Sequence, residues 1–234
     1  MARKIDDFLA WVGPKKGTFG NVMNFVGGRE YVVALDLSET NPRSEEFKTP
    51  KGLYYYIQEC MDLSSTFVGI GGYLERRNLY RDKPLFNPQK DPLDERCIHL
   101  GIDIWTREGR SVRTPLRAKV HSLGYHEEEG NYGGVIILEH RPFNCPKFYT
   151  LYGHLSKASV EALEVGQMID RSTIIGTLGS TEENGGWRPH LHFQIIMDLQ
   201  GHQGDYPGVC SPRELAEMKA NCPNPNLILD SPLL

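Results

Sequence analysis

The chain has 234 residues, a formal net charge of −4 and a sequence pI near 6.1. This length is enough for one large or two small domains with a real hydrophobic core. The mildly acidic composition offers no polybasic surface, which argues against a dedicated nucleic-acid binder. No apolar run approaches the roughly 20 residues that a membrane span needs.

The compartment is inferred from the N-terminus and the cysteines. Arg3 and Lys4 are followed by Asp6 and Asp7, without the apolar stretch of a secretory signal. The five cysteines are odd in number and widely spaced, which fits neither a disulfide scaffold nor a cysteine-type zinc site. We therefore expect reduced thiols and a cytoplasmic location for the chain as written, and an extracytoplasmic one if an upstream leader has been removed.

Residues 1–95 are predicted to form an N-terminal α+β extension. Apolar residues at 8–12 indicate a short helical turn, Tyr31–Leu37 has the β-branched, apolar composition of a strand, and Gly52–Leu63 has helix-compatible spacing. Prolines recur through Arg81–Glu95, which reads as a connector. We place a soft domain boundary near residue 95.

The stretch Gly69–Tyr80, G-I-G-G-Y-L-E-R-R-N-L-Y, has two interpretations. It can be a glycine turn that enters a solvated strand or helix. It can also be a substrate-facing loop, in which Arg76 or Arg77 holds an anionic group and Tyr73 or Tyr80 donates hydrogen bonds. The second interpretation makes Tyr73, Arg77 and Tyr80 the candidate substrate-binding residues.

From residue 96 the sequence changes to short strands separated by glycine, proline and acidic turns. This pattern predicts a mainly β fold, an antiparallel β-sheet or sandwich, over residues 96–205. Ser156–Leu163 is the one convincing helix of this part, with Ser156 as its N-cap. Residues 206–234 are Pro-rich, with a short helix near Pro212–Ala220, and are expected to wrap the body as a strap. The predicted strands are Cys97–Trp105, Arg117–Gly124, Gly133–His140, Lys147–His154, Thr173–Leu178 and His190–Met197.

The segment Trp187–Ile196, W-R-P-H-L-H-F-Q-I-I, carries the first chemical signal. Side chains alternate along a strand, so His190 and His192 project to one face, with Cα atoms roughly 6.5 Å apart. Two imidazoles between apolar neighbours suit a metal ligand beside a second polar role such as proton transfer. The alternative is a pair of surface histidines on an edge strand.

His99 and Asp103, in H-L-G-I-D, supply the second signal. A straight strand would separate them by roughly 13 Å, so both can bind one ion only if the chain bends, as Gly101 permits. The alternative is a strand end with two polar residues. Together with His192 they would give two imidazoles and one carboxylate, which leaves the fourth position of a tetrahedral zinc ion open for catalysis.

His154, in Y-T-L-Y-G-H-L-S, ends a predicted strand directly after Gly153. A lone histidine at a strand end is usually a surface residue. Gly153 lets another segment approach closely, so His154 can join a site that other strands build.

The segments H-L-G-I-D, Y-G-H-L-S and P-H-L-H-F resemble the three motifs of the M23 metallopeptidases, the lysostaphin or LytM type. The resemblance covers roughly residues 96–200 in consistent order. It implies Zn²⁺ held by His99, Asp103 and His192, with His154 and His190 activating water and stabilising the oxyanion. It also implies a small antiparallel β domain with the site in a groove, and endopeptidase cleavage of peptidoglycan, often at glycine-containing bonds.

A finer resemblance concerns the flanking segments G-G-Y-L-E-R-R-N-L-Y, L-D-L-S and C-P-N-P-N-L. They look similar to M23-type segments that lie between a phosphotransferase-like and a class III aminotransferase-like module. This resemblance implies that Tyr31–Glu95 belongs to the catalytic unit and that the substrate differs from peptidoglycan.

Three functions therefore compete. The first is a zinc-dependent endopeptidase that acts on a peptide or peptidoglycan-like substrate. The second is a non-catalytic module that uses the groove for binding. The third is a hydrolase of a small amide or amino-acid conjugate, with Gly69–Tyr80 closing one end of the groove; this hypothesis predicts a pocket near the metal.

Overall fold

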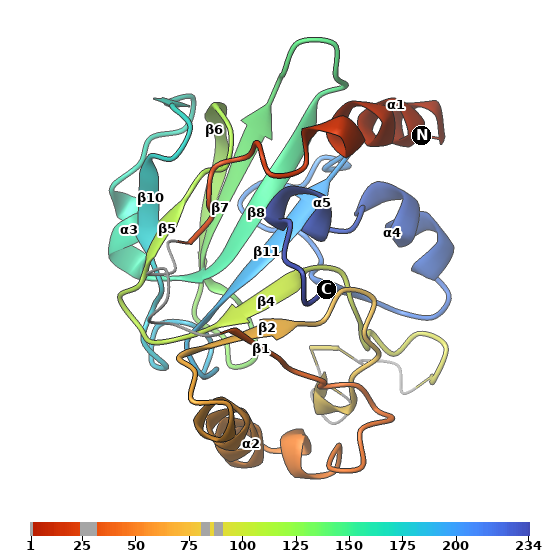
Figure 1. Cartoon of the computed structure of the whole chain (residues 1–234), viewed down its shortest axis with the longest axis vertical. Coiled ribbons are helices and arrows are strands. Elements are labelled where there is room, and N and C mark those ends of the chain that lie inside the picture. Colours follow the sequence, from red (N-terminus) through yellow and green to blue (C-terminus); the bar gives the residue numbers. More distant parts are fainter. Residues whose placement is uncertain (1, 24–31, 81–84, 87–90) are drawn as a thin grey trace.

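The protein is built on one eight-stranded sheet with the strand order β1-β2-β4-β11-β8-β7-β6-β9 (Figure 1). The structure is a computed structural model that describes residues 2–23, 32–80, 85–86 and 91–234. β1 and β2 pair in parallel and the remaining neighbours pair antiparallel, so the predicted mainly β, antiparallel fold is confirmed. The strands are β1 (Val32–Ala34), β2 (Val68–Gly71), β4 (Ile102–Trp105), β6 (Ala118–His126), β7 (Gly133–His140), β8 (Phe148–Leu155), β9 (Met168–Ile169) and β11 (His190–Ile196).

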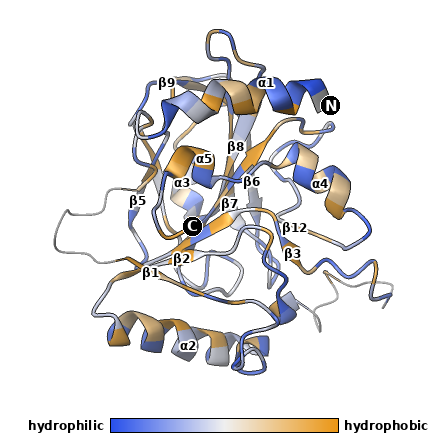
Figure 2. Ribbon diagram, turned by 45° about the vertical axis from the view of Figure 1, so that its right-hand side comes forward, coloured by the Kyte–Doolittle hydropathy of each residue, from blue (hydrophilic) through white to orange (hydrophobic). Residues whose placement is uncertain are grey.

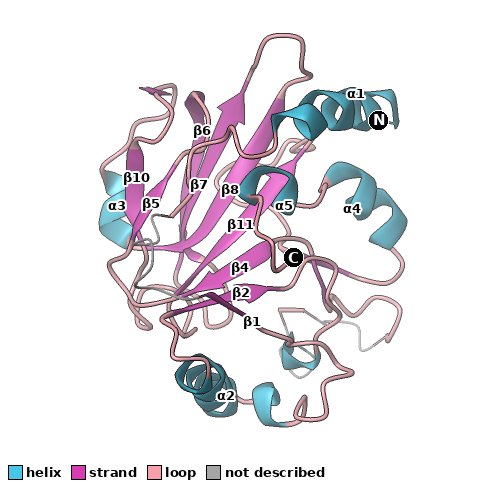
Figure 3. Ribbon diagram, viewed as in Figure 1, coloured by secondary structure: helices cyan, strands magenta, loops and turns pink. Residues whose placement is uncertain are grey.

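Two small sheets and several helices complete the described residues (Figure 3). The small sheets pair β5 (Ser111–Arg113) with β10 (Ile174–Thr177) and β3 (Ile98–His99) with β12 (Val209–Cys210). The α-helices are α1 (Ala2–Val12), α2 (Pro50–Leu63), α3 (Lys157–Glu161), α4 (Leu215–Asn221) and α5 (Asn226–Leu229), and 3-10 turns occupy Gly13–Lys15, Glu46–Lys48 and Asn78–Tyr80. Among the helices that the structure describes, none is long and apolar enough to cross a membrane.

Capping residues set where the two predicted internal helices begin. The Thr49 side chain accepts a hydrogen bond from the Gly52 amide at the start of α2, and Ser156 caps α3 through the Ser159 amide. α2 then buries one side, which includes Leu53 and Ile57, and Figure 2 shows hydrophobic residues recurring along it. Both helix predictions are confirmed.

Both faces of the sheet are covered by other parts of the chain, and the side chains of β11 alternate between the two faces. Its alternate residues Leu191, Phe193 and Ile195 belong to one apolar cluster. Helix α1 lies over the same face, where the ring of Phe8 packs against that of Phe148 on β8 at a centroid distance of 4.9 Å. The polar residues of β11 therefore point to the opposite face.

The N-terminal part contributes strands to the same sheet, because β2 pairs with β4 and places Gly71 opposite Asp103. The predicted division at residues 95 and 205 stays a prediction, but the sheet runs across its first boundary. β2 itself was expected to be a glycine turn. Its glycines instead admit a close neighbour: a Cβ on Gly71 would lie 2.4 Å from the Leu35 carbonyl oxygen. Within the predicted strand Tyr31–Leu37 and connector Arg81–Glu95, residues 31, 81–84 and 87–90 lie outside the described residues.

Candidate metal centre and active site

The register of the central strands builds the first half of the site. β11 pairs with β4 so that His192 stands opposite Asp103 and His190 opposite Trp105. The two histidines share the face away from the apolar cluster of β11, as their alternation predicts. The imidazole of His190 stacks on Trp105 at a centroid distance of 3.8 Å, which fixes the plane of its ring.

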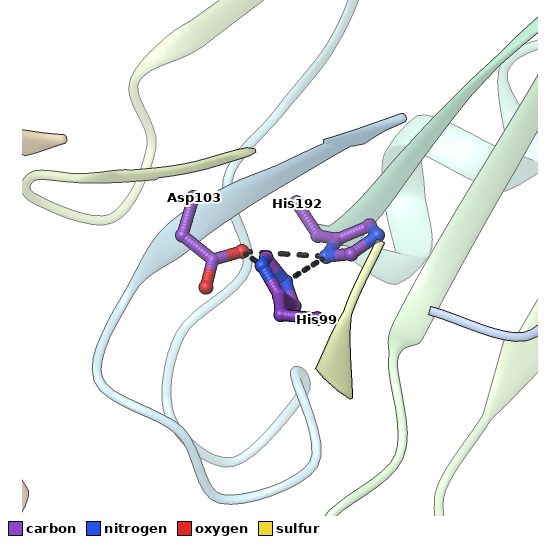
Figure 4. A group of neighbouring side chains, drawn as sticks. All are labelled: His99, Asp103 and His192. Atoms are coloured by element: carbon purple, nitrogen blue, oxygen red, sulfur yellow. Dashed lines mark hydrogen bonds and ion pairs between the residues drawn. The ribbon is translucent and has the colours of Figure 1, made fainter. Parts of the chain in front are cut away.

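A bend in the chain brings His99 to the same place. β3 ends at His99 and β4 begins at Ile102, so the predicted single strand is broken at Gly101. A Cβ on Gly101 would lie 2.5 Å from His192 Cε1, so a larger residue would collide with this imidazole. Because of the bend, His99 Nε2 lies 3.3 Å from Asp103 Oδ1 (Figure 4).

The three predicted metal ligands converge in a buried cluster. His192 Nδ1 lies 3.3 Å from Asp103 Oδ1 and 2.9 Å from His99 Nε2. Their candidate ligand atoms all lie within 4.8 Å of one another. Each of the three residues is no more than 3% exposed. Figure 4 shows both imidazoles and the carboxylate turned toward a common point.

In each of the three side chains, the nitrogen or oxygen atom that faces away from this point has a hydrogen-bond partner in the protein. His99 Nδ1 lies 2.8 Å from the Gly72 carbonyl oxygen, which can only accept, so Nδ1 carries the hydrogen. His192 Nε2 lies 2.9 Å from Gln194 Oε1, whose amide nitrogen donates to the Pro207 carbonyl. The Arg77 guanidinium donates to Asp103 Oδ2 at 2.7 Å. Both imidazoles therefore present lone pairs inward.

This inward set of atoms fits a divalent metal ion. Two nitrogen lone pairs cannot hydrogen-bond to each other, and Asp103 Oδ1 has no hydrogen-bond partner among the described residues. Burial alone would raise the pKa of Asp103, but His99 and Arg77 hold it well below its usual range. Burial lowers the pKa of His99 to about 4. A carboxylate and two imidazoles form a donor set that zinc binds.

His154 and His190, the predicted catalytic pair, stand beside these ligands. Their ring centroids are 4.0 Å apart. His154 Nδ1 donates to the Asn184 carbonyl at 3.0 Å and His190 Nδ1 to the Arg188 carbonyl at 2.7 Å. Nε2 of each ring is therefore an acceptor, and both residues line the same cavity.

The backbone of His154 is unusual for a histidine in a strand. Its φ of 63° lies in the left-handed region, which a residue with a side chain adopts at a cost. The residue is the last but one of β8; its amide donates to the Tyr132 carbonyl and its own carbonyl accepts from the Gly179 amide. These two bonds hold the strained conformation, so the surrounding loops orient the imidazole.

The two catalytic candidates are neutral in the folded protein at neutral pH. Burial lowers the pKa of His190 to about 4. Burial also lowers the pKa of His154, to well below its usual value. Neutral rings with Nε2 unprotonated can accept protons.

A cavity of about 250 Å³ opens onto all five of these residues. One wall comes from the N-terminal part of the chain and includes Leu53, Tyr80 and Phe86. Trp187 belongs to the same apolar cluster as these three residues and also lines the cavity. The site therefore combines a polar floor with an apolar side wall.

The three residues predicted to bind substrate lie in different surroundings. Tyr80 lines the cavity, and its ring is 4.8 Å from that of Phe86. Arg77 also lines the cavity, but it is buried against Asp103 and Glu75. Tyr73 lies outside the set of described residues that line the cavity, and its hydroxyl donates to the Cys222 carbonyl at 2.7 Å.

Sequence reasoning missed Gln194 and the Gly72 carbonyl. Gln194 follows His192 by two residues, so the pattern H-x-H-x-Q placed it on the same face of the strand. That signal was available. No sequence signal pointed to the contact between Gly72 and His99, because this contact depends on how the segment after β2 lies along β3.

Comparisons with known proteins agree with this geometry. Residues 97–205 match the model of peptidase family M23. An uncharacterized metalloprotease of Haemophilus influenzae is 28% identical over 173 residues, which are 73% of this chain and 33% of the relative. This chain thus spans about a third of the length of that curated relative.

Solved structures of peptidases are also similar over part of the chain. A zinc-containing peptidase from Vibrio cholerae is 30% identical, with a TM-score of 0.34, over 46% of this chain and 30% of that one. The catalytic domain of lysostaphin from Staphylococcus simulans is 21% identical, with a TM-score of 0.33, over 53% of this chain and 80% of that one. From the family match and the metalloprotease relative, we conclude that residues 97–205 of this chain are a metallopeptidase domain of the M23 type.

Proposed function

We propose that the protein is a zinc-dependent endopeptidase that hydrolyses peptide bonds in peptidoglycan-type or other glycine-containing peptides. The observation that carries this proposal is the convergence of three inward ligand atoms beside two neutral histidines in one cavity. His99, Asp103 and His192 would hold the ion. The chemistry that Zn²⁺ supplies in such a site is Lewis acidity, which polarises a substrate carbonyl and lowers the pKa of water.

His154 and His190 would carry the proton transfers. Hydrolysis of an amide needs a base that takes a proton from the attacking water and an acid that protonates the departing amine. Each Nε2 is an acceptor because each Nδ1 donates to a main-chain carbonyl. A ring that has accepted a proton can then donate it to the amine nitrogen, or hydrogen-bond to the oxyanion of the tetrahedral intermediate.

The cavity also favours a second candidate, the hydrolysis of a small amide or amino-acid conjugate. Its volume of about 250 Å³ is small for a peptide groove, and the side chains of Leu53, Tyr80 and Phe86 wall one side. Of these wall residues, Tyr80 belongs to the Gly69–Tyr80 stretch that this hypothesis places at one end of the groove, whereas Leu53 and Phe86 lie outside that stretch. A substrate with one compact apolar group would fit between this wall and the histidines.

The two candidates are separated by substrate length. The full chain, loaded with one equivalent of zinc, is incubated with a panel of oligoglycine peptides, muropeptides, dipeptides and N-acyl amino acids. We expect cleavage of the longer peptides, loss of cleavage with a chelator and its return with zinc. Turnover confined to dipeptides or N-acyl amino acids would favour the second candidate. Zinc-loaded protein that cleaves nothing in the panel would contradict both.

A further inference from the structure

The segment from Gly72 to Arg77 lies outside the part of the chain that matches family M23, yet it runs alongside the first metal-ligand strand. The Leu74 amide donates to the His99 carbonyl at 2.8 Å, and the His99 amide donates to the Glu75 carbonyl at 3.0 Å. The Arg77 amide donates to the Cys97 carbonyl at 2.8 Å. This segment is therefore fixed to β3 by its main chain.

Arg77 is the charged group that this segment delivers to the site. Its side chain is 2% exposed, and Nη1 lies 2.7 Å from Asp103 Oδ2. Nε lies 2.6 Å from Glu75 Oε2, and the Tyr80 hydroxyl is 3.2 Å from Nη1. Glu75 is held in turn, because its Oε1 accepts from the Leu37 amide at 2.8 Å. The guanidinium is thus engaged on several sides.

The two oxygens of the Asp103 carboxylate have different roles. Oδ2 is occupied by Arg77, whereas Oδ1 faces His99 Nε2 and His192 Nδ1 at 3.3 Å each. A planar guanidinium fixes both the position and the plane of a carboxylate, which a lysine ammonium does less well. The contact with Arg77 therefore decides which oxygen is left for a cation.

The same segment also holds a second ligand. The Gly72 carbonyl accepts from His99 Nδ1, and a Cβ on Gly72 would lie 2.0 Å from Arg77 Nη2. The glycine therefore lets the arginine lie directly beneath the turn that orients His99. Partners that hold the outer atoms of metal ligands commonly set the affinity of the site.

We propose that Arg77 is a positioning residue of the metal centre, which turns Asp103 Oδ1 toward the ion and balances the buried carboxylate. Together with the Gly72 carbonyl, it makes the N-terminal part of the chain a component of the metal site. The inference rests on the proposed function only in taking His99, Asp103 and His192 as the ligands.

The experiment compares Arg77→Met with Arg76→Met in the full chain. Arg76 is the matched control, because it is the preceding residue, its side chain is 43% exposed and it forms an ion pair with Glu39, which is not one of the three ligands. Zinc affinity is measured by competition with a chromophoric chelator. The visible spectrum of the Co²⁺-loaded protein reports the coordination geometry, and far-UV circular dichroism reports the fold.

We expect Arg77→Met to fold and to bind zinc about 10–100-fold more weakly, with an altered Co²⁺ spectrum. Arg77→Lys should recover part of the affinity, and Arg76→Met should match the unchanged protein. A folded Arg77→Met that keeps the affinity and the spectrum would overturn the proposal. If Arg77→Met does not fold, Arg77→Gln decides in its place, since it retains a donor without the charge; unchanged affinity and spectrum there would also overturn the proposal.

These readouts separate the proposal from the proposed function. If the unchanged protein binds zinc but cleaves no peptide, the function fails while the effect of Arg77 on metal affinity still stands. If the protein cleaves peptides and Arg77→Met binds zinc normally, the role of Arg77 alone is wrong.

Discussion

Two groups of buried histidines differ in how their ring nitrogens are paired: His140 on β7, and the metal-centre pair of His99 on β3 and His192 on β11. His140, at the end of β7, is 0% exposed; its Nδ1 donates to the Arg117 carbonyl and its Nε2 hydrogen-bonds with the Thr150 hydroxyl at 2.8 Å. The Thr150 hydroxyl in turn lies 3.1 Å from that of Tyr152. In the metal centre, by contrast, His99 and His192 turn lone pairs toward each other.

Burial alone therefore does not identify a functional histidine in this protein. Around His140 the protein provides a partner for each ring nitrogen, which is the usual solution for a buried polar group. At the metal centre, a carboxylate oxygen and two imidazole nitrogens converge as acceptors. Acceptors that converge without a donor indicate a cation, whereas a closed network indicates a structural role.

The largest effect is expected from replacing His154. Replacing His154 with Ala should leave zinc binding intact and lower turnover by about 10²–10⁴-fold, because a proton-transfer group is lost. Zinc content by mass spectrometry and kcat on a cleavable peptide check this prediction. His121→Ala is the control, because His121 is on β6, bonds Ser122 and does not line the cavity; it should keep full turnover. Normal turnover in His154→Ala would remove this histidine from the mechanism.

Asp103 tests whether the converging acceptors also matter for the fold. Asp103→Ala should abolish tight zinc binding and destabilise the metal-free protein by roughly 3 kcal/mol, because it leaves the buried Arg77 with one carboxylate partner instead of two. Urea unfolding in the presence of a chelator measures the loss. Asp103→Asn keeps the shape and should lose less stability. An unfolding midpoint equal to that of the unchanged protein would show that the ion pair is not stabilising.

The structural role of His140 is tested by the pH dependence of stability. Burial lowers its pKa from 6.5 to about 4, so the unfolded chain binds a proton at higher pH than the folded protein does. This contribution to the free energy of unfolding is fully present above pH 6.5 and is lost as the pH falls. The loss reaches on the order of 3 kcal/mol by pH 4. The free energy of unfolding of His140→Gln should accordingly fall less steeply than that of the unchanged protein. Parallel curves between pH 7 and pH 4, both measured without metal, would contradict the prediction.

Much of the fold follows from local patterns that the sequence displays. Alternation placed His190 and His192 on one face of β11, and the glycine of H-L-G-I-D permitted the bend that brings His99 to Asp103. The Ser156 cap predicted where α3 begins. These features depend on neighbours within a few residues, which is the range that single-sequence reasoning reaches.

The remaining features depend on contacts between distant segments. β2 looked like a glycine turn, because the close approach of Leu35 that its glycines allow cannot be read from composition. Arg77 was assigned to substrate because an arginine after a glycine loop suggests an exposed anion site. Only the pairing of its segment with β3 reveals the contact with Asp103.

The pairing of β2 with β4 has a consequence for any shortened form of this protein. The family match begins at residue 97, but a chain cut there would lose β1 and β2 and turn β4 into an outer strand. The main-chain groups of Ile102–Trp105 would then be open to another copy, which is a common route to aggregation. Insolubility of such a fragment would report a missing neighbour, whatever the quality of its catalytic residues.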